Sequence, residues 1–204
     1  MLRRRATTTI RASSRSFCGK NGTSLHDEGR ARRKYARPRE RSSPSGTYHS
    51  DVDRLTGLAD ASEFFESLPN LSAQQERLSL VLFDVDDLHL LNERHGTAET
   101  DRLLAHLGSV IRERRGPDEI GARIGGDEFA LCLLEDDTSE IVREVERIRQ
   151  LFGEESGGAT LSVGVCEAAT WRRASVRLSL IEAAQDALNE AKRQRPAGLS
   201  IFRL

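Results

Sequence analysis

The chain has 204 residues, a length that suits one domain with a tail. Its 31 Lys and Arg residues nearly balance its 32 Asp and Glu residues, and the net charge is −1. No segment approaches the roughly 20 apolar residues that a bilayer-spanning helix needs, and no apolar stretch follows the basic N-terminus, so we expect neither a membrane span nor a secretory signal.

The charge is unevenly distributed along the chain. Residues 1–50 contain 13 Lys and Arg but 3 Asp and Glu, so the remainder is acidic. A basic tail can bind nucleic acid, an anionic membrane or another copy of the chain. Residues 1–49 have almost no apolar clusters, however, and cannot bury enough surface to offset chain entropy. We therefore predict a solvated, disordered segment over 1–49 that does not bind nucleic acid, and a folded domain over 50–204.

Three cysteines, Cys18, Cys132 and Cys166, lie far apart and form no CxxC pair. Such an odd, sparse set argues against a disulfide framework or a zinc site, and it fits a reducing, cytoplasmic environment. Cys132 and Cys166 lie inside apolar runs, which predicts that both pack in the core.

The first predicted elements are a short helix over 61–68, a polar turn over 69–75 and a strand over 78–85. The strand is apolar almost throughout, which is typical of a strand buried on both faces. A helical pattern follows over 88–92. A second helix is predicted over 101–114, where apolar residues recur on one helical face.

Two short apolar runs, 120–124 and 129–134, flank Gly125-Gly126 and predict a β-hairpin, because glycine accepts the positive φ of tight hairpin turns. A helix over 138–152, a strand over 160–166, a helix over 176–192 and a strand over 199–202 complete the chain. This order predicts an α/β (α+β) fold, in which helices flank one mainly antiparallel central sheet.

Carboxylates gather at two places: Asp84, Asp86 and Asp87 end the first strand, and Asp127 and Glu128 lie at the hairpin tip. Clustered carboxylates repel one another, so a fold that assembles them usually neutralises them with a cation. If the strand pairs beside the hairpin, the two groups meet at one edge, where oxygen ligands suit Mg²⁺ bound together with substrate phosphates. That combination is typical of phosphoryl transfer, whereas each group alone also fits a solvated loop or an ordinary turn.

Gly125-Gly126-Asp127-Glu128-Phe129 spells the signature of the GGDEF family of diguanylate cyclases. Further segments resemble the family in the same order: DRLTGL over 53–58, FDVDDLHLLN over 83–92 with Gly96 and Asp101 behind it, Arg123, LSVGV over 161–165, and the helix that ends at Lys192. The resemblance extends from about residue 51 to residue 204. It implies a ferredoxin-like core, similar to nucleotidyl cyclases and the polymerase palm, and the condensation of two GTP into cyclic di-GMP and pyrophosphate.

The resemblance also implies the metal ligands and the catalytic carboxylates. Asp84 and Asp127 would bind Mg²⁺ (or Mn²⁺) through their side chains, and Val85 through its carbonyl. Asp127 or Glu128 would assist deprotonation of the ribose 3′-hydroxyl that attacks the second GTP.

Substrate contacts are implied in the same way. Asn92 and Asp101 would contact guanine, whose donors and acceptors an amide and a carboxylate complement. Lys192 would place a point charge on the phosphates. The phosphates would contact the backbone of Asp87, Leu88, His89 and Gly126.

The chain departs from the family pattern at several positions. Thr97 and Thr100 replace a His and a Gly, His89 replaces a Lys, Asn189 replaces a Tyr, and Pro196 replaces a phosphate-binding Arg. Arg193 and Arg195 are both candidates to compensate for that Arg. We expect an active enzyme whose rate depends on this compensation.

Arg115 and Asp118 form an RxxD pattern ahead of the signature, which resembles the family's inhibitory product site. The pattern lies one residue too early, and strict register would place Gly116 and Glu119 there. Two explanations of this pattern remain open. Either a one-residue loop insertion restores the inhibitory site, or the pattern is a chance occurrence in a highly charged chain.

Catalysis would require a homodimer, because each domain would hold one GTP. The alternative is a catalytically inactive receptor that binds GTP or cyclic di-GMP and acts through protein contacts. The changes at His89, Asn189 and Pro196 favour the receptor, whereas the intact Asp84 and Gly125–Phe129 favour the enzyme.

Overall fold

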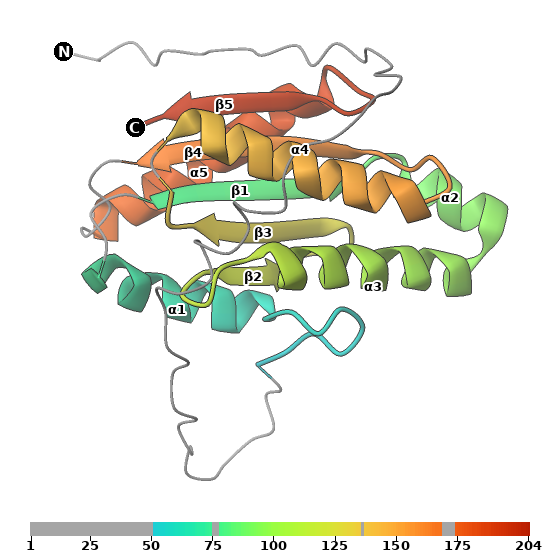
Figure 1. Cartoon of the computed structure of the whole chain (residues 1–204), viewed down its shortest axis with the longest axis horizontal. Coiled ribbons are helices and arrows are strands. Elements are labelled where there is room, and N and C mark those ends of the chain that lie inside the picture. Colours follow the sequence, from blue (N-terminus) through green and yellow to red (C-terminus); the bar gives the residue numbers. More distant parts are fainter. Residues whose placement is uncertain (1–50, 75–77, 136, 169–173) are drawn as a thin grey trace, which may run out of the picture.

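The computed structural model of the chain describes residues 51–74, 78–135, 137–168 and 174–204. In this part of the chain, helices pack against one five-stranded sheet (Figure 1). The elements in chain order are α1 (Ala61–Gln74), β1 (Leu78–Val85), α2 (Leu88–His95), α3 (Thr97–Arg114), β2 (Ile120–Arg123), β3 (Glu128–Leu133), α4 (Thr138–Glu155), β4 (Leu161–Ala168), α5 (Ala174–Lys192) and β5 (Leu199–Arg203).

The strand order in the sheet is β2-β3-β1-β4-β5. The pairs β2/β3, β3/β1 and β1/β4 are antiparallel, and the pair β4/β5 is parallel. The predicted fold, a mainly antiparallel sheet flanked by helices, is therefore confirmed. The central position of β1 explains its continuous apolar sequence, because every one of its residues is buried.

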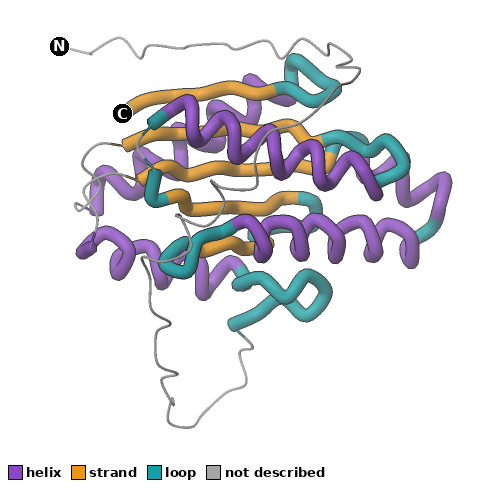
Figure 2. The backbone as a smooth tube through the Cα atoms, in the orientation of Figure 1, coloured by secondary structure: helices purple, strands orange, loops and turns teal. Residues whose placement is uncertain are grey.

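Helices and the connecting loops enclose the strands of the sheet (Figure 2). The two faces of the sheet carry separate hydrophobic cores. Alternate residues of β1 point to opposite faces, so Val81 and Phe83 join one core, and Leu80 and Leu82 join the other. Buried residues of α3 and α4 cover the first face, and those of α1 and α5 cover the second. Both described cysteines, Cys132 and Cys166, are buried in the second core, as predicted.

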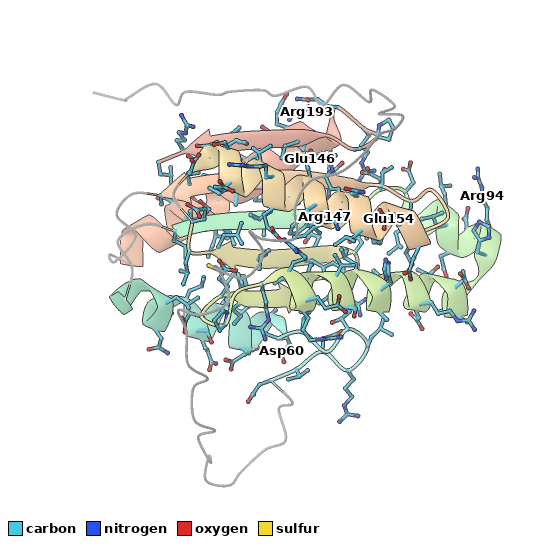
Figure 3. The ribbon with its side chains drawn as sticks, viewed as in Figure 1. Asp60, Arg94, Glu146, Arg147, Glu154 and Arg193 are labelled. Carbon is cyan, nitrogen blue, oxygen red and sulfur yellow. The ribbon has the colours of Figure 1, made fainter. Side chains whose placement is uncertain are left out.

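Helix α4 shows how an amphipathic pattern positions a helix on the sheet. Its residues Ile141, Val145 and Ile148 are buried, whereas Arg147 and Glu154 are exposed (Figure 3). The helix begins after Asp137, whose side chain accepts a hydrogen bond from Ser139 N and so caps the first turn. Within the described residues, none of the helices has the length and apolar character to cross a membrane.

Two predicted helix boundaries are wrong by more than one helical turn. Helix α1 continues through Pro69, where a turn was expected, because Leu68 is buried and Leu71 beyond the proline packs against the same core. Helix α3 begins at Thr97 and not at Asp101. Gly96, with φ 82° and ψ 167°, accepts a hydrogen bond from Thr100 N, and its glycine conformation lets α2 end and α3 begin at one residue.

The predicted hairpin forms between β2 and β3, but not through the expected backbone conformation. Positive φ occurs at other glycines, not at Gly125 or Gly126. Ile124 N and Gly125 N both donate to Glu128 O, which closes the turn. Gly126 is exposed, and a Cβ there would meet nothing within 4 Å, so its backbone is open to a ligand.

The segment 1–49, predicted to be disordered, and Cys18 lie outside the described residues.

Candidate active site

The two carboxylate groups meet at one edge of the sheet, as the sequence predicts if β1 lies beside the hairpin. Strand β1 pairs with β3 so that Asp84 lies opposite Glu128. Val85 N donates to Asp127 O at 3.2 Å, which fixes the hairpin tip against the end of β1. The pairing register therefore brings Asp84, Asp127 and Glu128 together.

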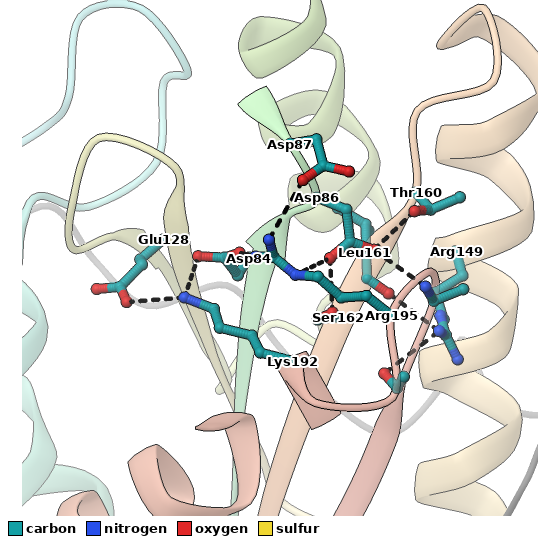
Figure 4. A network of polar contacts seen from close by, with 12 residues as sticks. Asp84, Asp86, Asp87, Glu128, Arg149, Thr160, Leu161, Ser162, Lys192 and Arg195 are labelled. Carbon is teal, nitrogen blue, oxygen red and sulfur yellow. Dashed lines mark hydrogen bonds and ion pairs between the residues drawn. The ribbon is translucent and has the colours of Figure 1, made fainter. Parts of the chain in front are cut away.

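Asp84 is the buried centre of this edge (Figure 4). Only 1% of the residue is exposed, and its two oxygens face two cations. Lys192 Nζ lies 2.5 Å from Oδ2, and Arg195 Nη2 lies 2.7 Å from Oδ1. Burial raises the pKa of Asp84 above its ordinary value, and Asp127 adds to the shift, although Lys192 and Arg195 act in the opposite direction.

The donor set at this edge fits a hard cation such as Mg²⁺. Asp84 Oδ2 is buried and accepts no hydrogen bond of regular geometry, although Lys192 lies beside it. Searched over the described residues, the structure holds no cluster of three or more His, Cys, Asp or Glu side chains suited to a metal. Mg²⁺ typically uses one or two carboxylates and takes its other ligands from phosphates and water. Asp84, Asp127 and the Val85 carbonyl fit that requirement.

Arg123 holds the signature turn in place through hydrogen bonds to its backbone carbonyls. Its Nε donates to Gly125 O at 3.1 Å, and its Nη2 donates to Gly126 O at 2.7 Å. Its Nη1 lies 3.5 Å from Asp53. Although burial alone would raise it, hydrogen bonds from Thr56 and the charge of Arg123 hold the pKa of Asp53 below its ordinary value. The segment DRLTGL over 53–58 thus supports the turn through the contact of Asp53 with Arg123.

Asp86 differs from Asp84 because its carboxylate is saturated with hydrogen bonds. It accepts from Thr160 Oγ1 and Ser162 Oγ, both at 2.6 Å, and from Ala197 N at 3.0 Å. Arg195 Nε lies 2.9 Å from its Oδ1. These contacts join the end of β1 to β4 and to the loop between α5 and β5, so Asp86 is a structural anchor.

The start of α2 borders the carboxylates. Asp87 is the N-cap of this helix, in the left-handed conformation at φ 55°, and its side chain makes no capping hydrogen bond. The first N–H groups of a helix have no intrahelical partner, so those of 88–90 can meet an anion. His89 is 81% exposed and pairs with Glu93 at 3.1 Å.

The residues expected to contact guanine lie on either side of the corner between α2 and α3. Asn92 is exposed on α2, and Asp101 is half-buried in the second turn of α3. Thr100, the neighbour of Asp101, lies with its Oγ1 3.4 Å from Asn92 Oδ1 and 3.2 Å from Gly96 O. Thr100 thus holds the two sides of the corner together.

The RxxD residues lie in the turn between α3 and β2, and the neighbouring Glu119 has a structural role. Arg115 Nη1 donates to Glu119 O at 2.9 Å. The Glu119 carboxylate accepts from Gly116 N at 2.6 Å and from Leu134 N at 3.0 Å. Burial raises the pKa of Glu119, although both hydrogen bonds act against this. Asp118 is half-buried in the same turn.

Two features of this edge were not predicted from the sequence. The sequence offered Arg193 and Arg195 equally, yet Arg195 contacts the carboxylates, whereas Arg193 is 72% exposed and pairs with Glu190. Asp86 was expected only as one member of the carboxylate group that a cation neutralises, and its role as an anchor was not predicted. Its position two residues after Asp84, on the same side of an extended chain, is a signal that could have indicated contact with the same loop.

Comparison with known proteins assigns the family. A family model described as diguanylate cyclase, GGDEF domain, matches residues 50–197. Diguanylate cyclase DgcN of Escherichia coli is 30% identical over 152 residues, which cover 70% of this chain and 37% of that protein. Cyclic di-GMP phosphodiesterase PdeB of Shewanella oneidensis is 37% identical over 84 residues, which cover 41% of this chain and 10% of that protein. The chain thus spans little more than a third of the length of these relatives, or less.

Solved structures agree on the fold. The GGDEF domain of DgcB from Caulobacter crescentus, in complex with c-di-GMP, has a TM-score of 0.66 at 24% identity and covers 78% of this chain and 98% of that one. The FimX GGDEF domain from Pseudomonas aeruginosa has a TM-score of 0.63 at 22% identity, with 76% and 99% covered. The family match and the shared fold agree, and the chain belongs to the GGDEF-domain family.

Proposed function

We propose that the chain is a diguanylate cyclase that condenses two GTP into cyclic di-GMP and two pyrophosphates. The observation that carries the proposal is the meeting of buried Asp84 with the hairpin carboxylates beside Lys192. The hairpin lies within the residues 50–197 that match the diguanylate cyclase, GGDEF domain, family, to which the chain belongs.

In this proposal, Asp84, Asp127 and the carbonyl of Val85 hold Mg²⁺ or Mn²⁺. The bound metal neutralises charge on the phosphates and polarises the attacked phosphorus. Asp84 suits this role because its buried carboxylate has an oxygen without a regular hydrogen bond. Lys192 and Arg195 lie beside this carboxylate and compensate its charge.

The chain's own residues also bind the substrate. The N–H groups at the start of α2, beside Asp87, Leu88 and His89, and the open backbone at Gly126 receive phosphate oxygens. Lys192 supplies a positive charge next to Asp84 and 3.8 Å from Glu128. Asn92 and Asp101 bind guanine at the corner between α2 and α3.

The reaction joins two nucleotides held on two copies of the domain. Asp127 or Glu128 accepts the proton from the 3′-hydroxyl of one GTP, and the oxygen attacks the α-phosphate of the other. A P–O bond forms, and the bond to pyrophosphate breaks with the electron pair leaving on pyrophosphate. The same step in the other direction closes the ring, so the active unit is a homodimer. Arg115 and Asp118 are the candidate residues for binding the product.

Incubation of the purified full chain with GTP and Mg²⁺, followed by chromatography, tests the proposal. Cyclic di-GMP and pyrophosphate should accumulate in a molar ratio of one to two. A protein that binds GTP or cyclic di-GMP but forms no product at any protein concentration would be the inactive receptor instead, and the cyclase proposal would be wrong.

A further inference from the structure

We propose that Arg195 binds the phosphates of the nucleotide, in the place of the Arg that Pro196 replaces. The inference rests on the proposed function, because it concerns the same substrate. It assigns to one particular residue a contact that the sequence left open between Arg193 and Arg195.

Hydrogen bonds to β4, to α4 and to Asp86 hold the loop that carries Arg195 in place. Gly198 O accepts from Val163 N at 2.9 Å and from Arg149 Nη2 at 3.3 Å. Ala197 N donates to Asp86 at 3.0 Å. A Cβ at Gly198 would lie 1.9 Å from Ala191 O, so the loop packs directly on the end of α5. The backbone at 195 therefore has a defined position beside the end of β1.

The guanidinium group of Arg195 is aimed at the candidate site. Its Nε lies 2.9 Å from Asp86 Oδ1, its Nη2 lies 2.7 Å from Asp84 Oδ1, and its Nη1 lies 3.5 Å from Asp87 Oδ1. Asp86 is itself held by Thr160 and Ser162. The first two contacts orient the guanidinium plane, and the third is long enough for a stronger acceptor to replace it.

A phosphate oxygen at the start of α2 is such an acceptor. Asp87 is the N-cap residue of α2, so Nη1 points toward the helix end whose N–H groups lack intrahelical partners. Lys192 Nζ lies on the other oxygen of Asp84. A guanidinium, an ammonium and a helix N-terminus thus lie next to Asp84 and Asp87, and a planar guanidinium forms paired hydrogen bonds with phosphate.

The charge of the edge supports the same conclusion. Asp84, Asp86 and Asp87 contact Arg195 directly, and Asp127 and Glu128 lie beside them. A nucleotide triphosphate that approaches five carboxylates needs cations already in position. Loss of Arg195 removes one of these cations and one set of donors, so binding should weaken.

The test measures the affinity of the full chain for a GTP analogue with a methylene group between the α- and β-phosphates, which cannot be condensed. Calorimetric titration with and without Mg²⁺ compares the wild type with Arg195→Ala. A charge-assisted hydrogen bond to phosphate implies a dissociation constant raised by about tenfold or more. Thermal unfolding of each variant confirms that it is folded.

Arg193→Ala is the matched control, because it removes the same side chain two residues away, where it is exposed and contacts Glu190. Its affinity should stay within about twofold of the wild type. Arg195→Lys keeps the charge but not the paired donors, and its affinity should fall between the wild type and Arg195→Ala. If Arg195→Ala does not fold, the affinity of Arg195→Lys is compared with those of the wild type and Arg193→Ala instead.

The inference is wrong if Arg195→Ala and Arg195→Lys bind the analogue as tightly as Arg193→Ala. Tighter binding by Arg195→Ala also overturns it, because Arg195 would then compete with the ligand for the carboxylates. Both results leave the proposed function intact, whereas a wild type that binds no GTP analogue contradicts the proposed function itself.

Discussion

Asp84 and Asp86 lie two positions apart at the end of β1, yet their surroundings give them different chemistry. Asp86 is saturated by Thr160, Ser162 and Ala197 N, and it has no oxygen left for a metal. Asp84 contacts two cations through ion pairs and keeps a buried oxygen without a regular hydrogen bond. At the residue scale, the number of fixed donors around each carboxylate therefore separates the anchor from the candidate metal ligand.

The variant Asp84→Asn should lower the rate of cyclic di-GMP formation by at least about a hundredfold, because it removes the charge that would hold the metal. The rate is measured with saturating GTP and Mg²⁺, and circular dichroism confirms the fold. Asp51→Asn removes an exposed carboxylate and should leave the rate unchanged. Equal rates for the two variants would remove Asp84 from the proposed mechanism.

The turn between α3 and β2 shows how one side chain can hold an element in place. Glu119 bridges Gly116 N in the turn and Leu134 N at the end of β3. It does so half-buried, and burial raises its pKa above the ordinary value of 4.5. A raised pKa in the folded state means that the protonated form is favoured there, so the contribution to stability is full below pH 4.5 and is lost as the pH rises through the raised pKa.

The variant Glu119→Gln should therefore reveal a stability difference that depends on pH. The free energy of unfolding of the wild type, relative to the variant, should be larger at pH 4 than at pH 8. Within the titration window the change is at most about 1.4 kcal/mol per pH unit. Urea denaturation at a series of pH values gives the difference. Glu113→Gln, at an exposed site on α3, serves as the control, and a difference that grows with rising pH would contradict the assigned cause.

At the scale of the whole molecule, one sheet edge collects side chains from β1, the β2–β3 hairpin, the start of α2 and the end of α5 (Figure 4). In the proposed function, each copy of this site holds one nucleotide, whereas the proposed product contains two. The domain thus supplies half of the proposed reaction, and the second half requires another copy.

The rate per molecule should consequently depend on protein concentration. Below the dissociation constant of the dimer, a tenfold dilution should lower the rate per molecule by about tenfold, because the fraction of paired chains falls by mass action. At high concentration the rate per molecule should reach a plateau. Initial rates over a wide range of protein concentration check this. A constant rate per molecule, with cyclic di-GMP still formed, would contradict assembly of the site from two freely dissociating copies.

The amino-acid sequence by itself determined the type and order of the elements from 78 onward. It predicted that the two carboxylate groups meet only if β1 pairs beside the hairpin, and the structure supplied that pairing. The apolar run of β1 and the helical spacing in α3 and α4 are local patterns, and local patterns survive folding because each places apolar side chains on a face that the sheet buries. The turn expected at Pro69 is wrong, because helix α1 continues through this residue. The contacts of Leu68 and Leu71 with the core outweigh the local effect of proline.

Only the tertiary structure decided which arginine joins the site and what Asp86 does. Arg193 and Arg195 lie in the same short stretch, and nothing local distinguishes them. Arg195 reaches Asp84 across 111 positions of sequence, and Asp86 reaches Ser162 across 76. Such pairs depend on the strand order β1-β4-β5 and on the path of the loop before β5, and these are set by the packing of the whole sheet.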